Sequence, residues 1–257
     1  MTLNIDIDIG NTRSKWSIAS GSKNVVVGCT AKPIAEVASE ITATFAEHDM
    51  NGAAVSRIRV ACVRSQQEKD ALACALHAAF AVAAEFAQTT AEAGGVINSY
   101  LKPHTMGVDR WSAIAAAAAL MQAQAKPQPF CIVDAGSAVT LDFVSAAGVH
   151  CGGYITPGYY LQLKALLAGT QKVMAGEQAS VELIAPGSNT SDAVHAGIAA
   201  SIVAHIERGV AQFKMAQGAS PQVFITGGDA ELLQGLSGLP MLHRPHLVLS
   251  GLAQLLP

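Results

Sequence analysis

The sequence predicts an α/β protein built from two halves that repeat the same short motif. In the first half, alternating apolar residues over 5–9 predict a strand, which runs into a polar turn and returns as a second strand at 15–19. In the second half the same order recurs over 130–143: an apolar strand, an Asp, a Gly-containing turn and a returning strand. The segment Lys-Pro-Gln-Pro at 126–129 breaks the chain between them. A repeat half a chain apart is typical of two similar domains.

The composition bounds the class of protein. The chain has 257 residues, of which 51% are hydrophobic and 14% charged, enough for a substantial core. The net charge is −3 and no Lys/Arg run occurs, so nucleic acid is not expected as a partner. No apolar run is long enough to cross a bilayer and no signal peptide is visible, so we expect a cytoplasmic protein with no membrane partner. The five cysteines lack a CxxC pair, which indicates reduced thiols.

The first turn carries residues that suit a nucleotide. Asp8 ends the strand, Gly10, Asn11 and Thr12 make the turn, and Lys15 follows. We expect Gly10 to adopt a positive φ and to let the backbone approach a ligand. The carboxylate can bind Mg²⁺, while backbone N–H groups, the hydroxyl and the lysine can bind phosphates. The alternative is an ordinary hairpin turn in which Asp8 and Asn11 bond to their own backbone.

In the remainder of the first half, strands and helices alternate less regularly than in a Rossmann domain. Strands are predicted at 24–29 and 58–63, and helices at 34–47 and 66–79. This β-β-β-α-β-α order lacks the strict βαβ alternation, and neither GxGxxG nor a Walker A motif is present. The sequence therefore excludes a P-loop kinase.

A long loop, 93–110, precedes an alanine-rich helix predicted to run from Asp109 to about Gln124. Loops of this length in a compact chain are commonly functional. The structural alternative for Asp109 is a helix N-cap, with Ser112 as a competing cap.

The second half continues after the turn at Gly136 with a glycine-rich strand, Cys151 to Gly158, and a helix at 159–167. A long helix begins near Thr190, whose alternative role is the N-cap. The strand at 222–229 ends in Gly-Gly, which is typical of a turn facing a phosphate or nucleotide. Closing helices are predicted at 232–236 and 247–256. The eight histidines lack metal-ligand spacing, and no GxSxG elbow occurs.

Four segments together resemble the type III pantothenate kinases, some of which are described as Bvg accessory factor-like proteins. They are DIGNTRSKW (8–16), NSYLKPHTMGVDRW (98–111), DAGSAVTLD (134–142) and GGYITPG (152–158). The resemblance implies two duplicated ribonuclease-H-like domains of the actin-like, sugar kinase and Hsp70 superfamily, 1–118 and 119–257, with ATP in the interdomain cleft. It also implies a homodimer that phosphorylates pantothenate to 4′-phosphopantothenate, the first step of coenzyme A synthesis.

The resemblance assigns roles residue by residue. Asp109 corresponds to the catalytic base, and Asp134 to the ligand of a monovalent cation, K⁺ or NH₄⁺. Asp8 lies near Mg²⁺, directly or through water. The ATP-binding residues are Asp8, Ile9, Gly10, Asn11, Thr12, Arg13, Ser14, Lys15 and Ser137, the last standing where the family usually has Thr. The pantothenate-binding residues are Tyr100, Gly107, Val108, Asp109, Arg110 and, from the partner subunit, Thr190.

These roles agree with the chemistry of phosphoryl transfer, which depends on positioning and charge neutralisation. Asp109 can accept the proton of the attacking primary hydroxyl, and Arg110 can bind the pantothenate carboxylate with two hydrogen bonds. A cation at Asp134 would neutralise phosphate charge.

Two other functions remain open from the residues alone. One is another kinase or phosphatase of the same fold, acting on acetate, a sugar or polyphosphate, because a fold does not fix its substrate. The other is a regulatory accessory protein that binds nucleotide. The segment Tyr100 to Arg110 separates these alternatives from a pantothenate kinase.

Overall fold

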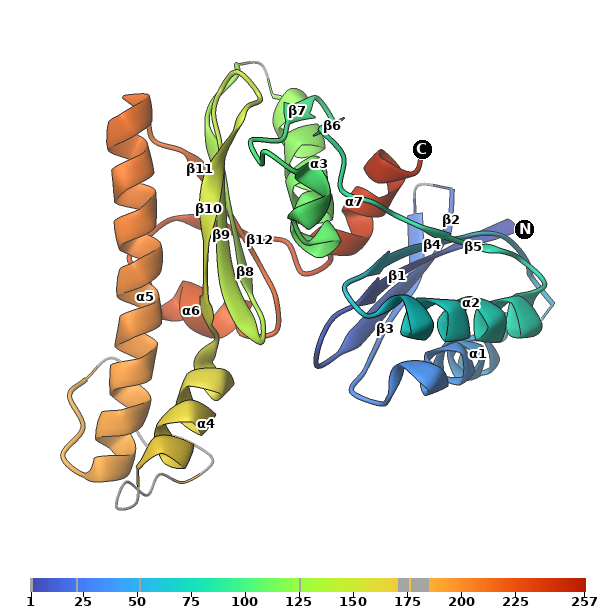
Figure 1. Cartoon of the computed structure of the whole chain (residues 1–257), viewed down its shortest axis with the longest axis horizontal. Helices are drawn as coiled ribbons and strands as arrows, with labels where there is room; N and C mark the ends of the chain where they lie inside the picture. Colours follow the sequence, from blue (N-terminus) through green and yellow to red (C-terminus); the bar gives the residue numbers. More distant parts are fainter. Residues whose placement is uncertain (1, 22, 51, 125, 171–175, 177–184) are drawn as a thin grey trace. The chain divides into compact units, whose positions relative to one another are not determined.

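The computed structural model describes residues 2–21, 23–50, 52–124, 126–170, 176 and 185–257. The chain forms two compact units, Met1–Leu120 with His246–Pro257, and Met121–Pro245 (Figure 1). Helix α7 (Leu247–Leu255) thus packs with the first unit although it ends the sequence. The resemblance implies a boundary between two duplicated domains at 118/119. That boundary stays a prediction.

The first unit contains a five-stranded sheet of order β3-β2-β1-β4-β5. Strands β1 (Thr2–Ile9), β2 (Ser14–Ser20) and β3 (Lys23–Thr30) are antiparallel neighbours, whereas β4 (Ala54–Cys62) and β5 (Ala84–Phe86) run parallel to β1.

Helices α1 (Val37–Glu47) and α2 (Gln66–Phe80) bury their apolar sides with one face of this sheet. Ile5, Ile7 and Ile9 point into that core because alternate residues of a strand share a face. A short 3₁₀ turn, Ile34–Glu36, precedes α1. The predicted helix at 34–47 and the predicted strands are therefore confirmed, with small shifts at their ends.

The opposite side of β1 carries a buried ion pair. The Arg59 guanidinium donates from Nε to Asp6 Oδ1 at 2.7 Å and from Nη2 to Oδ2 at 3.0 Å. Burial raises the pKa of the Asp6 carboxyl, and the hydrogen bonds and charge of Arg59 oppose that rise. Arg59 also donates to the backbone oxygen of Leu256, so the pair ties the end of the chain to β4.

The second unit repeats the sheet. Its order is β10-β9-β8-β11-β12, with β8 (Phe130–Ala135), β9 (Ala138–Val144) and β10 (His150–Pro157) antiparallel and β11 (Gln222–Thr226) and β12 (Met241–His243) parallel to β8. Both units thus have the same strand order and the same directions. This confirms the duplication that the repeated turn predicts.

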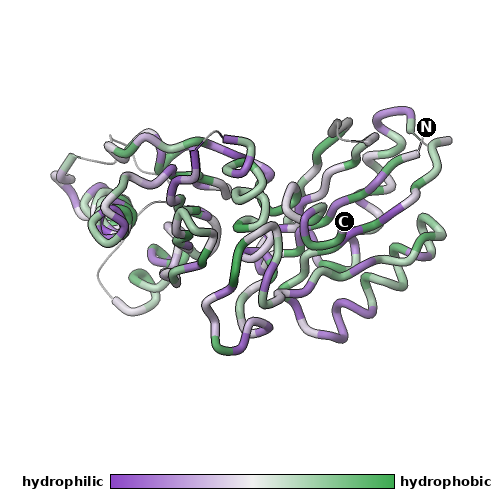
Figure 2. The backbone as a smooth tube through the Cα atoms, turned by 90° about the horizontal axis from the view of Figure 1, so that it is seen from above, coloured by the Kyte–Doolittle hydropathy of each residue, from purple (hydrophilic) through white to green (hydrophobic). Residues whose placement is uncertain are grey.

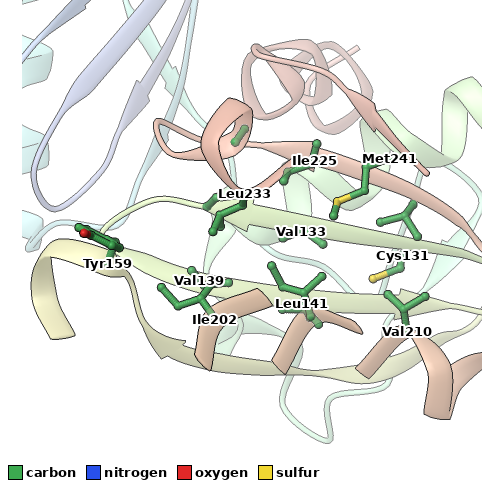
Figure 3. Packing of buried hydrophobic residues seen from close by; sticks show 14 of the residues in the cluster. Cys131, Val133, Val139, Leu141, Tyr159, Ile202, Val210, Ile225, Leu233 and Met241 are labelled. Carbon is green, nitrogen blue, oxygen red and sulfur yellow. The ribbon is translucent and has the colours of Figure 1, made fainter. Parts of the chain in front are cut away.

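One face of the second sheet is covered by α4 (Tyr159–Gly169), α5 (Thr190–Gln217) and α6 (Ala230–Leu236). Figure 3 shows the apolar side chains of this core, with Val139 and Leu141 of β9 close to Ile202 and Val210 of α5. The buried residues of this 28-residue helix recur every three to four positions, so one side of the helix faces the sheet along its length.

Helix α3 (Val108–Gln122), of which all but the last two residues belong to the first unit, packs with α7. The Ser112 hydroxyl donates to the backbone oxygen of Val248 at 2.7 Å. A Cβ at Gly251 would lie 1.9 Å from the backbone oxygen of Ser112, so only glycine permits this close crossing. The strongly apolar α7 is visible beside the C-terminal mark in Figure 2.

Two N-cap interpretations of the sequence are wrong. Helix α3 begins at Val108, so Asp109 lies within its first turn and Ser112 deeper in the helix. Helix α5 has Asn189 as its N-cap, because the Asn189 Oδ1 accepts the Asp192 N–H at 3.0 Å, and Thr190 is the first helical residue. Asn189 has the same capping ability as Thr190 and stands one position earlier.

The loop at 93–110 contains short structure that the sequence does not indicate: β6 (Glu92–Ala93), β7 (Val96–Ile97) and a 3₁₀ turn, Pro103–Thr105. None of the helices in the described ranges combines the length and the hydropathy that a membrane span requires.

Candidate functional site

The first candidate phosphate-binding turn joins β1 to β2. In the hairpin register Asp8 pairs with Lys15 and Ile9 with Ser14, so the carboxylate and the lysine project from neighbouring positions. The turn itself, Gly10 to Arg13, closes through a hydrogen bond from Gly10 N–H to Arg13 O at 3.1 Å. Asn11, Thr12 and Arg13 are exposed, whereas Asp8 and Lys15 are partly buried.

Gly10 suits this position for a reason other than the expected one. It does not have a positive φ, which the described glycines at 21, 94, 95, 148, 152, 218 and 227 do. A Cβ at Gly10 would instead lie 3.0 Å from the backbone oxygen of Arg13. The prediction of a left-handed backbone here is wrong, because the turn closes through the hydrogen bond from Gly10 to Arg13 without a positive φ.

Arg64 supports this turn and was not identified from the sequence. Its Nε donates to Gly10 O at 3.0 Å and its Nη2 to Asn11 O at 2.6 Å. It follows β4, whose last residue, Cys62, is in register with Ile9 at the end of β1. No local pattern could have found it, because its partners lie more than fifty positions earlier.

The candidate substrate segment brings Tyr100 and Arg110 together. Arg110 Nη1 donates to the Tyr100 hydroxyl at 3.0 Å, and the guanidinium carbon lies 5.8 Å from the centre of the tyrosine ring. Arg110 is only 7% exposed, so its charge sits in a poorly hydrated environment. Such a guanidinium favours a carboxylate ligand.

Asp109 lies beside these residues in the first turn of α3. Its Oδ1 accepts the backbone N–H of Arg110 at 2.8 Å, and a Cβ at Gly107 would lie 2.5 Å from the same oxygen. The glycine therefore makes room for the carboxylate. Val108, next to it, is buried. A carboxylate at a helix N-terminus is stabilised in its ionised form, as a general base requires.

Asn98 fixes the shape of the candidate substrate segment, Tyr100 to Arg110. Its Oδ1 accepts the Tyr100 N–H at 2.9 Å, and its Nδ2 donates to Thr90 O at 3.3 Å and contacts the Met106 sulfur at 3.6 Å. The Trp111 indole donates to the Thr90 hydroxyl. Asn98 belongs to the recognised sequence segment, but its connecting role is visible only in three dimensions.

The second turn, between β8 and β9, stands in the second unit where the first turn stands in the first unit, but it is shorter. Asp134 is partly buried at the end of β8, Ser137 is exposed, and Gly136 N–H donates to Ala138 O at 3.0 Å. Gly158 N–H donates to Ser137 O at 2.9 Å, and a Cβ at Gly158 would lie 2.2 Å from Gly136 O. The glycine after β10 therefore permits a backbone approach that no other residue allows.

The Gly-Gly turn after β11 lies against the same strand end. Gly227 has φ +101° and its missing Cβ would lie 2.3 Å from Ala135 O. Asp229 N–H donates to that oxygen at 2.9 Å. The ends of β8, β10 and β11 thus present closely packed backbone beside Asp134.

Thr190 begins α5 and is exposed. One turn further along, His195 is fully buried; its Nε2 bonds Gly176 O at 2.9 Å and its Nδ1 bonds the Tyr159 hydroxyl. Because a carbonyl only accepts, Nε2 carries the proton and the tyrosine donates to Nδ1. Burial raises the pKa of Tyr159, which keeps this donor protonated. His195 is therefore structural, as its sequence context indicates.

The oxygen-rich character of both turns suits hard cations. A single carboxylate, Asp8, fits a hydrated Mg²⁺ carried by a nucleotide, and Asp134 with nearby carbonyls fits a monovalent cation. Within the described ranges, no three His, Cys, Asp or Glu side chains gather into a dedicated metal cluster.

The duplicated sheet and its glycine turns define an actin-like ATPase fold. Solved structures with this fold include an activator of 2-hydroxyisocaproyl-CoA dehydratase from Clostridium difficile with bound ADPNP, at 12% identity and a TM-score of 0.55, covering 98% of this chain and 93% of that one. MreB 5 of Spiroplasma citri bound to AMPPNP gives 11% identity and 0.52, covering 98% and 95%. A Baf family transcriptional activator from Campylobacter jejuni gives 20% identity and 0.59, covering 98% and 95%.

The chain belongs to the type III pantothenate kinase family, whose model matches residues 4–212. A type III pantothenate kinase from Cellvibrio japonicus is 34% identical over 250 residues, covering 96% of this chain and 94% of that protein. One from Pseudomonas aeruginosa is 32% identical over 257 residues and covers 98% of each.

Proposed function

We propose that this protein transfers the γ-phosphate of ATP to the primary hydroxyl of pantothenate, giving 4′-phosphopantothenate for coenzyme A synthesis. Membership of a family of kinases defines the reaction class. The observation that carries the substrate is the arrangement of Asp109, Arg110 and Tyr100 in one short segment, which offers a base beside a buried cationic group.

In this proposal Asp109 accepts the hydroxyl proton as the oxygen attacks the γ-phosphorus. Arg110 and Tyr100 hold the substrate carboxylate, which fixes the distance of the hydroxyl from the base. Gly107 and Val108 shape the backbone there. A positioned base of this kind contributes about 10²–10⁴-fold to the rate.

Each glycine turn is proposed to offer groups that bind a nucleotide. In the first turn the residues from Asp8 to Lys15 supply backbone donors, the Thr12 hydroxyl and the lysine charge, with Mg²⁺ near Asp8. In the second turn Ser137 supplies a hydroxyl. We propose that Asp134 binds K⁺ or NH₄⁺, which supplies positive charge that a P-loop lysine supplies elsewhere.

We also propose that the protein is a cytoplasmic homodimer in which Thr190 contacts pantothenate bound to the partner subunit. Support comes from exposed apolar side chains on α4 and on the edge strand β10. They are Tyr154, Ile155, Tyr160, Leu161 and Leu166. Exposed apolar side chains are commonly buried in interfaces. Sedimentation of wild type, Tyr160→Glu and the control Met215→Glu tests it: a monomeric wild type contradicts the proposal.

A coupled assay of ADP release tests the reaction. ADP should appear with pantothenate but not with acetate, glucose or water, and only when K⁺ or NH₄⁺ is present. Release with a different acceptor would favour another kinase of this fold. Nucleotide binding without any release would favour a regulatory accessory protein.

A further inference from the structure

The Arg64 guanidinium bonds two successive carbonyls of the first turn, and this constrains the peptide planes. In a trans peptide unit the C=O and the N–H point in opposite directions. Gly10 O shares its peptide unit with the N–H of Asn11, and Asn11 O shares its unit with the N–H of Thr12. Because both oxygens point at Arg64, both N–H groups point away from it, on the same side of the turn.

Two successive N–H groups aimed to one side form an anion-binding concavity. Hydrogen bonds from a charged donor are stronger than neutral ones, so the guanidinium fixes this arrangement more firmly than a neutral side chain would. Its planar fork also matches two adjacent oxygens, which an ammonium does not.

Arg64 is itself held in place by the start of α2. The Glu68 Oε2 accepts the Ser65 N–H at 3.0 Å and the Ser65 Oγ accepts the Glu68 N–H at 3.4 Å, which is a complete capping box. The Ser65 hydroxyl also donates to Glu68 Oε2 at 2.7 Å. Glu68 Oε1 lies 3.8 Å from Arg64 Nη1. Val63 N–H donates to Ile9 O at 3.3 Å, which fastens the segment before Arg64 to the end of β1.

We propose that Arg64 is a positioning residue for the nucleotide polyphosphate: it orients the Asn11 and Thr12 amides before the nucleotide arrives. This inference rests on the proposed function only in taking the first turn as a phosphate site. It predicts that the loss of Arg64 weakens phosphate binding without changing recognition of the nucleoside or of pantothenate.

Calorimetric titration with Mg·ATP and with adenosine, both without pantothenate, tests the inference. In Arg64→Gln the Kd for Mg·ATP should rise about tenfold, the effect of one ordered charge-assisted contact, while that for adenosine stays within about twofold. Arg64→Lys should recover part of this loss or none. In steady state the KM for ATP should rise while the KM for pantothenate stays unchanged.

Arg57→Gln is the matched control. Arg57 lies on β4, its side chain is 29% exposed against 33% for Arg64, and it pairs with Glu85 and the backbone oxygen of Pro257 rather than with the turn. Its affinity for Mg·ATP should equal that of wild type. Thermal unfolding of every variant confirms folding. If Arg64→Gln does not fold, Ser65→Ala, which loosens the capping box, should show a smaller loss of the same kind.

Three results would overturn the inference: an unchanged Kd for Mg·ATP in Arg64→Gln, an equal loss for adenosine, or full recovery by Arg64→Lys, which would show that charge alone matters. Failure of the proposed function is recognised separately. A wild type that binds Mg·ATP but does not phosphorylate pantothenate contradicts the reaction, yet leaves the comparison of Arg64 variants intact.

Discussion

Arg110 donates a hydrogen bond from Nη1 to the Tyr100 hydroxyl at 3.0 Å while its guanidinium carbon lies 5.8 Å from the tyrosine ring centre. The two residues come from opposite ends of the candidate substrate segment. Their contact closes the loop between β7 and α3 and places two groups that can bind a carboxylate next to Asp109.

Asp109→Asn should lower kcat by about 10²–10⁴-fold, because the amide cannot accept the hydroxyl proton. The amide oxygen can still accept the Arg110 N–H, so the unfolding temperature should stay near that of wild type. Initial rates with saturating ATP and pantothenate measure the effect. An unchanged kcat would contradict the assignment of the base.

Tyr100→Phe should raise the KM for pantothenate about fivefold, the effect of about 1 kcal/mol from one lost hydrogen bond. The ring that lies near the guanidinium remains, so folding should be preserved. The KM for ATP is the internal control. An equal rise in both KM values would show that the residue does not act on pantothenate alone.

Gly158→Ala should destabilise the protein by about 1–3 kcal/mol, since its Cβ would overlap the backbone of the second turn. Chemical denaturation measures the change. The control is Gly235→Ala in α6, where no atom lies within 4 Å of the added Cβ. That substitution should be neutral or stabilising. An unchanged free energy of unfolding in Gly158→Ala would mean that the backbone at Gly136 can shift at little cost.

Glu68 makes stability depend on pH in a definite direction. Hydrogen bonds from the Ser65 side chain and backbone lower the pKa of Glu68 below its ordinary value of 4.5. The folded protein therefore gains stability from the ionised carboxylate above pH 4.5 and loses it as the pH falls through the folded pKa. Wild type should unfold at a higher temperature than Glu68→Gln at pH 7, and the difference should shrink below pH 4.5. A difference in unfolding temperature that does not change with pH would contradict this explanation.

Two of the five cysteines should resist alkylation in the native protein. Cys62 and Cys131 are buried, and burial raises the pKa of each thiol, so the reactive thiolate is scarce. Cys29, Cys74 and Cys151 are exposed. Mass spectrometry after iodoacetamide treatment, with and without urea, distinguishes the two groups. Labelling of Cys131 without urea would contradict its burial.

The repeated turns could be predicted because their signal is local. Each needs only an apolar strand, an Asp and a glycine within about ten residues, and both lie where the sequence indicates. The parallel partners β5 and β12 could not, because three residues carry too little periodicity. The N-cap at Asn189 was missed because neighbouring residues compete for the same role.

The supports of the candidate site could not be predicted because they join distant segments. Arg64 reaches back to Gly10 and Asn11, across a stretch that no periodicity connects. Gly158 differs, because the glycine-rich strand before it predicts a close backbone approach, which the structure confirms at Gly136. The sequence identifies candidate catalytic and binding residues, whereas the residues that position them can be identified only from the tertiary structure. Gly10 illustrates the difference: the sequence favours glycine there because of φ, whereas in the structure an added Cβ would lie 3.0 Å from Arg13 O.

The position of α7 has a consequence for biosynthesis. During translation, residues 121–245 leave the ribosome before the helix that covers β1 and β4, so the second unit can acquire its core while the first still lacks a cover. Until then the Asp6–Arg59 pair lacks the contact with Leu256. The first unit is therefore the first to be synthesised and the last to complete its packing.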